Sequence, residues 1–508
     1  MIKILLNSLF LFLFLYSIVS IGDFLKKFLL RQNHYKFLLS FSLGFIFFLL
    51  IFFLLYLISL NAAASKYLSL SATFLGAIYL HKKKEINLNL KHFILFFLGA
   101  LFFSLFNFIV WKPNNLDIFN VYASFGSLHL NKYIGILEYI RTCNVLPFIN
   151  QDYSNSLLNY LLNFLNLEDI YSFNLILSFF QVIFVLVIYD FLLFLRVKNK
   201  ILSTFVFMLS ATSFSLPFFV INDSGFPFVS IGYASIYLGL ILSLCLIYLG
   251  SIESYLNEKL FKLTELMLLL FLFIIAPHFL ILIFASYIIS RKINFYQILS
   301  LLLLFLFYSL FIGGMFSFQL FREFNYIPGV QNFSIDKSIN FVPFVPFKIY
   351  AQGDGFGQDI LTLLNKAYFN RFHYGNFILE NFFIGIKLLF ISLWVLMYPY
   401  LAVIFGYFKY NLNVNRFFIK SALICIILGF LFSFPFQING FKWELSRFNL
   451  LGAMFGILVL IFFIDRISSS RAKYALFLIL VFPYLSNFQY NRPVFDTNSF
   501  IPNNKITC

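Results

Sequence analysis

The chain has 508 residues, of which 61% are hydrophobic and 11% are charged, and phenylalanine alone occurs 79 times. Because a soluble domain carries about 25% charged residues, this composition excludes a soluble enzyme and a disordered protein. The mean hydropathy is +0.91. Apolar runs of about 20 residues recur from end to end, each long enough to cross a hydrocarbon core of about 30 Å. The sequence therefore predicts an all-α, polytopic transmembrane helical bundle.

The apolar runs predict about 14 spans. The first is expected to remain as a helix, because no small-residue signal cleavage site follows it. Residues 264–290 are interrupted by Pro277-His278, which allows either one kinked helix or a hairpin of two short helices. The distribution of basic residues favours the hairpin. The predicted spans are 4–22, 38–60, 63–80, 92–111, 171–195, 201–221, 228–250, 264–276, 278–290, 295–317, 381–408, 417–436, 448–464 and 474–488.

The net charge of +16 lies mainly in short connections between the spans and not in a patch on a soluble domain, so no nucleic-acid partner is expected. With the hairpin, the short basic connections share one side, which the positive-inside rule assigns to the cytoplasm. Both termini and two long loops, residues 112–170 and 318–380, then face outward. The abundance of Phe, Ile, Asn, Lys and Tyr indicates an AT-rich coding sequence, so we expect the inner (plasma) membrane of a bacterium.

Four cysteines are scattered singly along the chain. Cys245 and Cys425 lie inside apolar runs, so Cys143 and Cys508 form the only conceivable disulfide. The cysteines show no paired metal-ligand spacing, and no other metal motif is present.

The first long loop contains the segment NKYIGILEYI, in which Tyr133, Ile134, Leu137 and Ile140 recur at helical spacing. This pattern is typical of an amphipathic helix that lies along the membrane surface. Pro147 ends the segment, and a polar turn precedes a second apolar helix, LLNYLLNFL.

Residues 127–162, SLHLNKYIGILEYIRTCNVLPFINQDYSNSLLNYLL, resemble part of the GT-C superfamily of membrane glycosyltransferases. The shared features are a turn that contains histidine, an amphipathic helix with a basic or polar end, a polar turn and a further helix. Residues 268–290, LLLFLFIIAPHFLILIFASYIIS, also resemble the short hairpin of that family with its Pro-His tip. By layout the resemblance covers residues 92–465, and in detail it covers residues 127–162.

The resemblance implies a sugar transferase that uses a polyprenyl-phosphate-linked sugar as donor and an extracytoplasmic glycan, lipid or protein as acceptor. It implies three parts of the chain: accessory N-terminal transmembrane helices in residues 1–91, a GT-C-like transmembrane core with both long loops in residues 92–488, and an extracytoplasmic tail in residues 489–508. The active site is then on the extracytoplasmic side.

The family's catalytic acid does not occur at its usual place. In several such families an aspartate lies about five residues before the position of His129, and this chain has Ser124 there. The nearest acid is Asp117, seven residues before Ser124. Either Asp117 serves as the acid, or the catalytic acid is absent and the scaffold has another purpose.

The transfer needs a general base at the acceptor hydroxyl and positive charge at the departing phosphate, from side chains or from a divalent cation. Asp117 is the predicted catalytic base; its alternative role is a helix or turn cap. His129 is predicted to orient the acid or to bind substrate, and otherwise is a surface histidine. Arg141, the basic end of the amphipathic segment, is predicted to bind substrate.

A second group of charges precedes a span in GFKWELSRFNLLG, residues 440–452. Lys442, Glu444 and Arg447 are predicted to bind substrate, with Arg447 against the lipid phosphate, where its fork can hold two oxygens. The alternative is an interfacial Trp443 with cations that extend toward the headgroups.

Two other functions compete with the glycosyltransferase. A surface-polysaccharide polymerase or ligase of the O-antigen type would use arginines of the outer loops, such as Arg322, Arg371 and Arg447. A transporter or flippase would need matching broken helices and more intramembrane charge than this sequence contains. An acid in the first long loop favours the transferase, and cations in the later loop favour the polymerase.

Overall fold

The computed structural model describes residues 2–30, 36–83, 126–148, 153–167, 169–214, 234–252, 258–290, 292–314, 327, 339–341, 349–350, 357–358, 416–433, 436–438 and 448–486. The chain divides into two compact units. The first comprises Met1–Phe191, Gly232–Phe333 and Val494–Cys508, and the second comprises Leu192–Ile231 and Ser334–Pro493.

The described helices confirm a helical membrane protein. Four of them contain segments long and apolar enough to cross a membrane: Ile2–Leu29, Phe37–Ser59, Leu175–Phe194 and Ala234–Ile252. Four shorter apolar helices accompany them: Pro277–Ile289, Phe295–Phe311, Phe417–Leu428 and Met454–Asp465. The predicted spans 92–111 and 381–408 lie outside the described residues.

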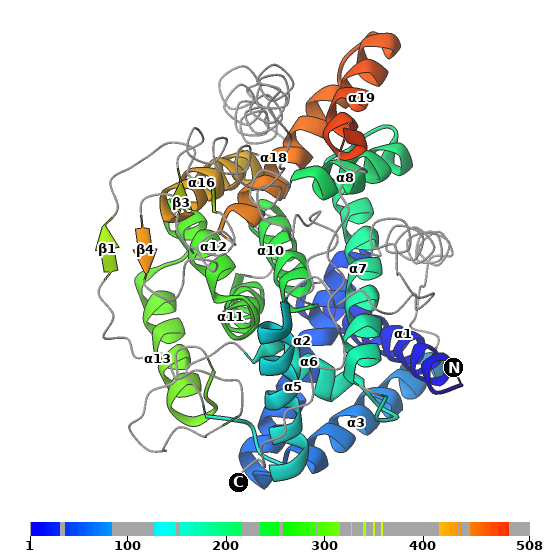
Figure 1. The fold of residues 1–508 in the computed structure, drawn as a ribbon, viewed down its shortest axis with the longest axis vertical. Helices are drawn as coiled ribbons and strands as arrows, with labels where there is room; N and C mark the ends of the chain where they lie inside the picture. The colour runs from blue at the N-terminus through cyan, green and yellow to red at the C-terminus, as the bar shows by residue number, and fades with distance from the viewer. Residues whose placement is uncertain are drawn as a thin grey trace, which may run out of the picture. The chain divides into compact units, whose positions relative to one another are not determined.

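The first unit is built from helices (Figure 1). Its elements are α1 (Ile2–Leu30), α2 (Phe37–Ser59), α3 (Ala62–Lys82), α5 (Gly126–Cys143), α6 (Ser154–Leu162), α7 (Asp169–Phe194), α10 (Ala234–Ile252), α11 (Glu258–Ile275), α12 (Pro277–Ile289) and α13 (Phe295–Phe311).

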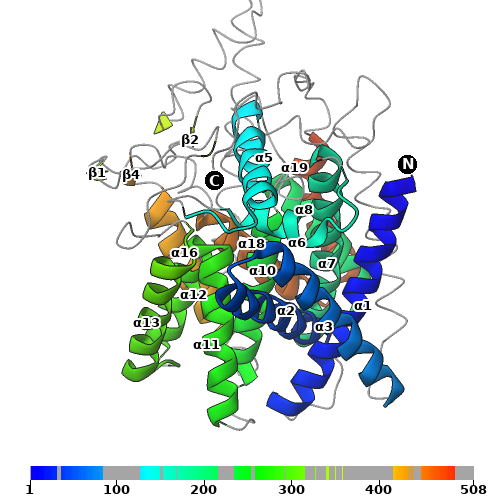
Figure 2. The same ribbon diagram turned by 90° about the horizontal axis from the view of Figure 1, so that it is seen from below.

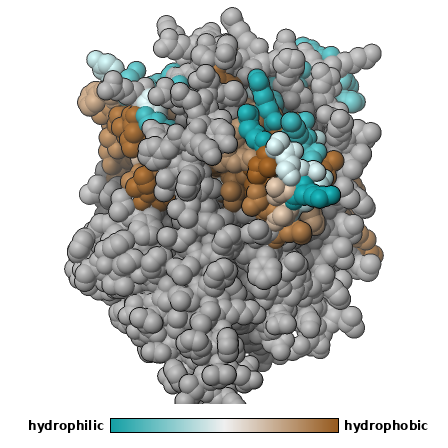
Figure 3. All heavy atoms as spheres, turned by 90° about the horizontal axis from the view of Figure 1, so that it is seen from above, coloured by the Kyte–Doolittle hydropathy of each residue, from teal (hydrophilic) through white to brown (hydrophobic). Residues whose placement is uncertain are grey.

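Several polar side chains of helix α3 are buried and several of its apolar side chains are exposed, as expected for a helix that faces lipid. Its polar residues Ser65, Lys66 and Thr73 are buried, whereas Leu75 and Ile78 are more than half exposed. A helix in water would show the opposite arrangement, because water favours polar side chains on the exposed face. Apolar side chains also gather on the surface in Figure 3, where they are brown. We conclude that hydrocarbon covers these exposed faces.

The first three helices pack against one another (Figure 2), and the α1–α2 crossing depends on glycine. A Cβ atom at Gly22 would overlap the carbonyl oxygen of Ser40, and one at Gly44 would overlap that of Ile18. Small residues let membrane helices approach backbone to backbone, where packing and polar contacts replace the hydrophobic driving force. This close crossing holds α1 and α2 together.

The predicted hairpin at 264–290 is confirmed. Helix α11 ends at Ile275, and α12 begins at Pro277, a residue well suited to a first helical position. Lys262 Nζ donates to the Lys292 carbonyl oxygen at 2.7 Å. In one continuous helix these residues would lie about 45 Å apart at about 1.5 Å per residue. The start of α11 and the residues after α12 are therefore neighbours, as in a hairpin.

Asp190 stabilises the first turn of another helix. Its Oδ2 accepts the backbone N–H of Leu38 at 3.0 Å, and Lys36, the N-cap residue of α2, provides no side-chain cap of its own. A carboxylate at a helix N-terminus satisfies an otherwise unpaired donor. The contact brings the end of α7 beside the start of α2, as expected if the connections 23–37 and 196–200 lie on the same side of the membrane.

The second unit contains α8 (Lys200–Phe214), α16 (Arg416–Ser433), α18 (Phe448–Asp465) and α19 (Ser470–Ser486). Asp465 accepts the backbone N–H of Lys198 at 2.7 Å and pairs with Lys473, which joins two predicted cytoplasmic connections. Two short antiparallel ladders accompany the helices: β1 (Ile339–Phe341) with β4 (Phe436–Ile438), and β2 (Ile349–Tyr350) with β3 (Gly357–Gln358).

Candidate functional site

The first long loop contains the predicted helix. Helix α5 spans Gly126–Cys143, and Tyr133, Leu137 and Ile140 on its apolar face are buried. Ile136 and Tyr139 are buried as well. Protein therefore covers more of α5 than the single face of a surface-lying helix, and polar contacts with its neighbours hold it in place.

The segment after α5 is fixed to the ends of α2 and α3. The Tyr56 hydroxyl of α2 accepts the backbone N–H of Leu146 at 2.9 Å. Ala62, the first residue of α3, donates its N–H to the carbonyl oxygen of Asn144 at 2.6 Å. Asn144 adopts the left-handed conformation, with a φ of 56°, which asparagine tolerates better than most residues. The chain thus turns sharply where it meets the N-terminal helices.

Helix α6 is anchored to the hairpin and to two more helices. Ser154 Oγ donates to the carbonyl oxygen of Ile274, at the end of α11, at 3.0 Å. Asn155 Oδ1 accepts the N–H of Ser235, in the first turn of α10, at 3.0 Å. The hydroxyls of Tyr153 and Tyr308 lie 3.0 Å apart. The two segments that carry the GT-C resemblance, residues 127–162 and 268–290, are therefore in direct contact.

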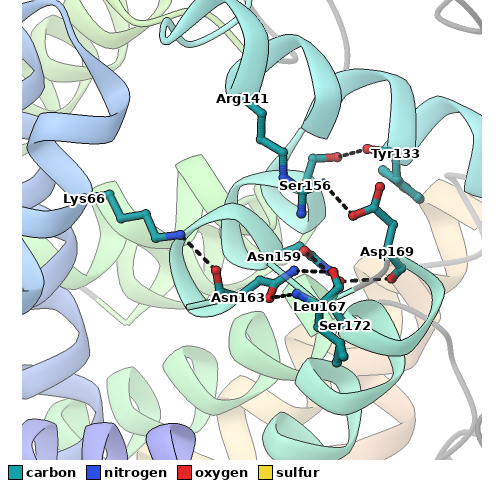
Figure 4. Close-up of polar contacts among 9 residues, drawn as sticks. All are labelled: Lys66, Tyr133, Arg141, Ser156, Asn159, Asn163, Leu167, Asp169 and Ser172. Atoms are coloured by element: carbon teal, nitrogen blue, oxygen red, sulfur yellow. Dashed lines mark hydrogen bonds and ion pairs between the residues drawn. The ribbon is translucent and has the colours of Figure 1, made fainter. Parts of the chain in front are cut away.

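A polar network joins α5, α6 and the start of α7 (Figure 4). Arg141 Nη1 lies 2.6 Å from Asp169 Oδ1, and the two side chains are 29% and 16% exposed. Asn159 Nδ2 donates to Ser172 Oγ at 3.0 Å, and Ser156 Oγ donates to the carbonyl oxygen of Tyr133 at 3.0 Å. A charged pair of this kind orients the planar Arg141 guanidinium at the edge of the network.

Lys66 of α3 enters the same network from the other side. Its Nζ donates to the carbonyl oxygen of Asn163 at 3.0 Å and lies 4.9 Å from the centroid of the Tyr160 ring. The Asn163 side chain closes the α6–α7 turn by bonding both the N–H and the carbonyl oxygen of Leu167 at 2.9 Å. Burial, with a smaller contribution from Tyr67, raises the pKa of Tyr160 to about 12 despite the opposing charge of Arg141. Tyr160 is therefore a neutral phenol at physiological pH.

The carboxyl group of Glu138, on α5, has a shifted pKa. Burial raises the pKa of its carboxyl above the usual range, the negative charge of Asp169 adds to the effect, and Arg141 opposes it. A carboxyl with a raised pKa is suited to proton transfer near neutral pH. The sequence contained a signal for this residue, because Glu138 and Arg141 are three apart on one helix and share a face.

The structure describes some of the predicted site residues and not others. Arg141 is described with its side chain and lies in the polar network. His129 lies on α5, and its side chain is outside the described part. Asp117, Ser124, Lys442, Glu444 and Arg447 lie outside the described residues. Within the described residues, no group of three or more His, Cys, Asp or Glu side chains could hold a metal ion.

Three of the four cysteines lie in the described part of the chain, and Cys508, the predicted partner of Cys143, lies outside it. Cys143, the last residue of α5, is disulfide-bonded, whereas Cys245 and Cys425 are buried and belong to no disulfide. Disulfides persist in oxidising compartments.

Compared with protein-family models, with curated proteins and with solved structures, the chain gives no match.

Proposed function

We propose that this protein is a membrane glycosyltransferase of the GT-C type, which transfers a sugar from a polyprenyl-phosphate donor to an extracytoplasmic glycan, lipid or protein acceptor. One observation carries the proposal: the Ser154–Ile274 contact joins the loop segment 127–162 to the hairpin that ends in Pro277-His278. These two segments resemble the family independently and are far apart in the sequence. Their contact is what a common site would require.

The chemistry of the first loop supports the same proposal. A transferase needs acids for proton transfer and cations at the departing phosphate. Arg141 and Glu138 stand on one helix, beside Asp169 at the start of α7. In the proposal Asp117 is the base at the acceptor hydroxyl, and His129 and Arg141 bind substrate.

The leaving phosphate is assigned to the second charged group. In the proposal Arg447 binds the phosphate, with Lys442 and Glu444 beside it, and a divalent cation is the alternative source of positive charge. The location proposed is the bacterial inner membrane with the site outside the cytoplasm. The disulfide at Cys143 and the short basic connections support this orientation.

The test compares lipid-linked sugars and surface glycans, by mass spectrometry, in native cells and in cells that carry Asp117→Asn. Accumulation of a polyprenyl-phosphate sugar, with loss of one sugar from the glycan, is the expected result and identifies the donor. A change in polymer length alone would instead favour the polymerase. No change in either would remove Asp117 from the mechanism.

The orientation of the chain in the membrane is tested separately, by labelling single introduced cysteines from outside the cell. Reagent should reach sites near residues 120 and 350 and should not reach a site near residue 83. Labelling near residue 83 would contradict the extracytoplasmic placement of the site.

A further inference from the structure

Two turns of the second unit lie together and expose a group of cations. Asp465, at the end of α18, accepts the backbone N–H of Lys198 at 2.7 Å, which joins the α7–α8 turn to the α18–α19 turn. Helices α8 and α19, which begin at these turns, pack against each other (Figure 1). We use the name basic patch for the exposed cationic side chains of the two turns: Arg196, Lys198, Arg466 and Arg471.

The backbone of the α7–α8 turn fixes two members of the basic patch. Arg196 adopts the left-handed conformation, with a φ of 59°, and Val197 donates its N–H to the carbonyl oxygen of Leu192 at 3.1 Å. These are features of the Schellman motif, which ends many helices. Val197 is buried, whereas Arg196 and Lys198 on either side of it are exposed. The turn therefore has a fixed shape with a cation at each side.

The basic patch has no acid in its own turns to balance its charge. Segments 196–200 and 466–473 contain no aspartate or glutamate. The charge of Asp465 is shared with Lys473, whose Nζ lies 3.5 Å from Asp465 Oδ1 and donates to the Asp465 carbonyl oxygen at 2.7 Å. Among the residues that the structure describes, no carboxylate forms an ion pair with a member of the patch. Cations on adjoining turns repel one another, so a bound anion is favoured there.

Exposed apolar side chains continue from the basic patch along both helices. On α8, Ile201 and Phe205 are 67% and 50% exposed, and on α19, Tyr474 and Leu478 are 51% and 67% exposed. The members of each pair are four residues apart and share one helix face. A phospholipid matches this combination, with its phosphate at the cations and its acyl chains beside the helices. A soluble anion would match the charges alone.

The predicted side of the membrane indicates which lipid is available. The connections 196–200 and 465–473 belong to the short basic connections that the positive-inside rule assigns to the cytoplasm. The cytoplasmic leaflet contains anionic phospholipids, and basic groups between helices at that membrane surface bind their headgroups.

We propose that the basic patch binds the headgroup of an anionic phospholipid of the cytoplasmic leaflet, and that the exposed apolar faces of α8 and α19 contact its acyl chains. Asp465 positions the site by holding the two turns together. The guanidinium carbon of Arg466 lies 4.5 Å from the centroid of the Phe462 ring, a contact that orients its hydrogen-bond donors. The site does not depend on sugar transfer.

The test compares two double variants of the purified full chain. Arg466→Gln with Arg471→Gln removes two cations of the patch, and Lys82→Gln with Lys83→Gln, the control, removes two exposed cations at the predicted cytoplasmic end of α3. Each delipidated protein is titrated with phosphatidylglycerol, and bound lipid is counted by native mass spectrometry. We expect the patch variant to bind about 30-fold more weakly than the wild type, because each cation near an anionic lipid contributes about fivefold. The control should bind like the wild type.

Two further ligands separate the parts of the proposal. Phosphatidylethanolamine, which has no net charge, and glycerol phosphate, which has no acyl chains, should each bind the wild type more weakly than phosphatidylglycerol does. Glycerol phosphate that binds as tightly as the lipid, with the same dependence on the patch, would assign the patch to a soluble phosphate and overturn the proposal. Equal binding of the two lipids would remove the role of the anionic headgroup.

The double variants give two more results that would overturn the proposal. Unchanged phosphatidylglycerol binding in the patch variant would remove the site. An equal loss in the control variant would show a general attraction of basic residues to anionic lipid and no particular site at these turns. Without lipid, the patch variant should unfold at the Tm of the wild type, because both substituted side chains are exposed.

Photo-crosslinking tests the same site in the wild type, without any substitution. Phosphatidylglycerol with a diazirine on its acyl chain should label residues 201–205 or 474–478 more strongly than phosphatidylethanolamine with the same label. The exposed residues Leu75 and Ile78 of α3, which face lipid in general, should be labelled equally by both probes. Equal labelling of α8 and α19 by the two probes would contradict the proposed site.

Discussion

The contact between Asn155 and α10 provides a quantitative prediction. Asn155 is 4% exposed, and its Oδ1 accepts the N–H of Ser235, which is 3% exposed and lies in the first turn of α10. In Asn155→Ala this buried donor loses its partner. An unsatisfied buried donor costs about 1–3 kcal/mol, and loss of a helix cap costs about 0.5–2 kcal/mol by the same mechanism. We therefore expect the free energy of unfolding to fall by about 1–3 kcal/mol.

Unfolding of the purified protein by SDS in mixed micelles measures this change. Ser243→Ala is the matched control, because Ser243 is also buried on α10 but its hydroxyl bonds only to Gly239 of the same helix. That bond adds little to a helix, so the control should change the free energy by less than about 0.5 kcal/mol. Equal stability of Asn155→Ala and the wild type would refute the anchoring role given to α6.

Three further predictions concern covalent structure, packing and pH. Peptide mapping without reduction should find Cys143 linked to Cys508, and a free Cys143 thiol would contradict this pairing. Gly44→Leu should lower the free energy of unfolding by about 1–3 kcal/mol or prevent assembly, because its side chain would overlap the backbone of α1 at Ile18. Because the pKa of Glu138 is raised in the folded protein, its ionisation costs stability. The wild type should therefore lose stability relative to Glu138→Gln as the pH rises through the raised pKa. Below the pKa of Glu138 in the unfolded chain, this difference in stability between the two proteins should vanish. A pH-independent difference between these two proteins would show that Glu138 titrates normally.

The sequence predicted the helices and the hairpin because both depend on local patterns. Apolar length specified both ends of α2 to within one residue and the end of α10 to within two residues, and the distribution of basic residues chose the hairpin at Pro277 over a kinked helix. The regular spacing of Tyr133, Leu137 and Ile140 specified α5. These signals lie within one element or its immediate neighbours, so a single sequence contains them.

The tertiary partners could not be predicted in the same way. Asp190 caps α2 from α7, a contact between residues 152 positions apart. Lys66 was within an apolar span, and nothing in that span indicated that it would meet Asn163 and Tyr160. Periodicity shows which side of a helix is buried, but it does not identify the helix that covers it.

The candidate site was predicted in part. Arg141 was selected from the resemblance, and the structure adds its ion pair with Asp169 and its neighbour Glu138. The proposed base Asp117 remains a prediction, because it lies outside the described residues.

The proposed function, transfer of sugar from a polyprenyl-phosphate carrier, can be measured with purified components. The most direct measurement reconstitutes the purified wild type and Asp117→Asn in liposomes made from the lipid extract of native cells, with an acceptor fraction from the same cells. Mass spectrometry then follows each polyprenyl-phosphate sugar. We expect the wild type to convert one such lipid to free polyprenyl phosphate with transfer of its sugar, and Asp117→Asn not to do so. Failure of the wild type to consume any lipid-linked sugar, or equal consumption by the variant, would contradict the proposed transfer.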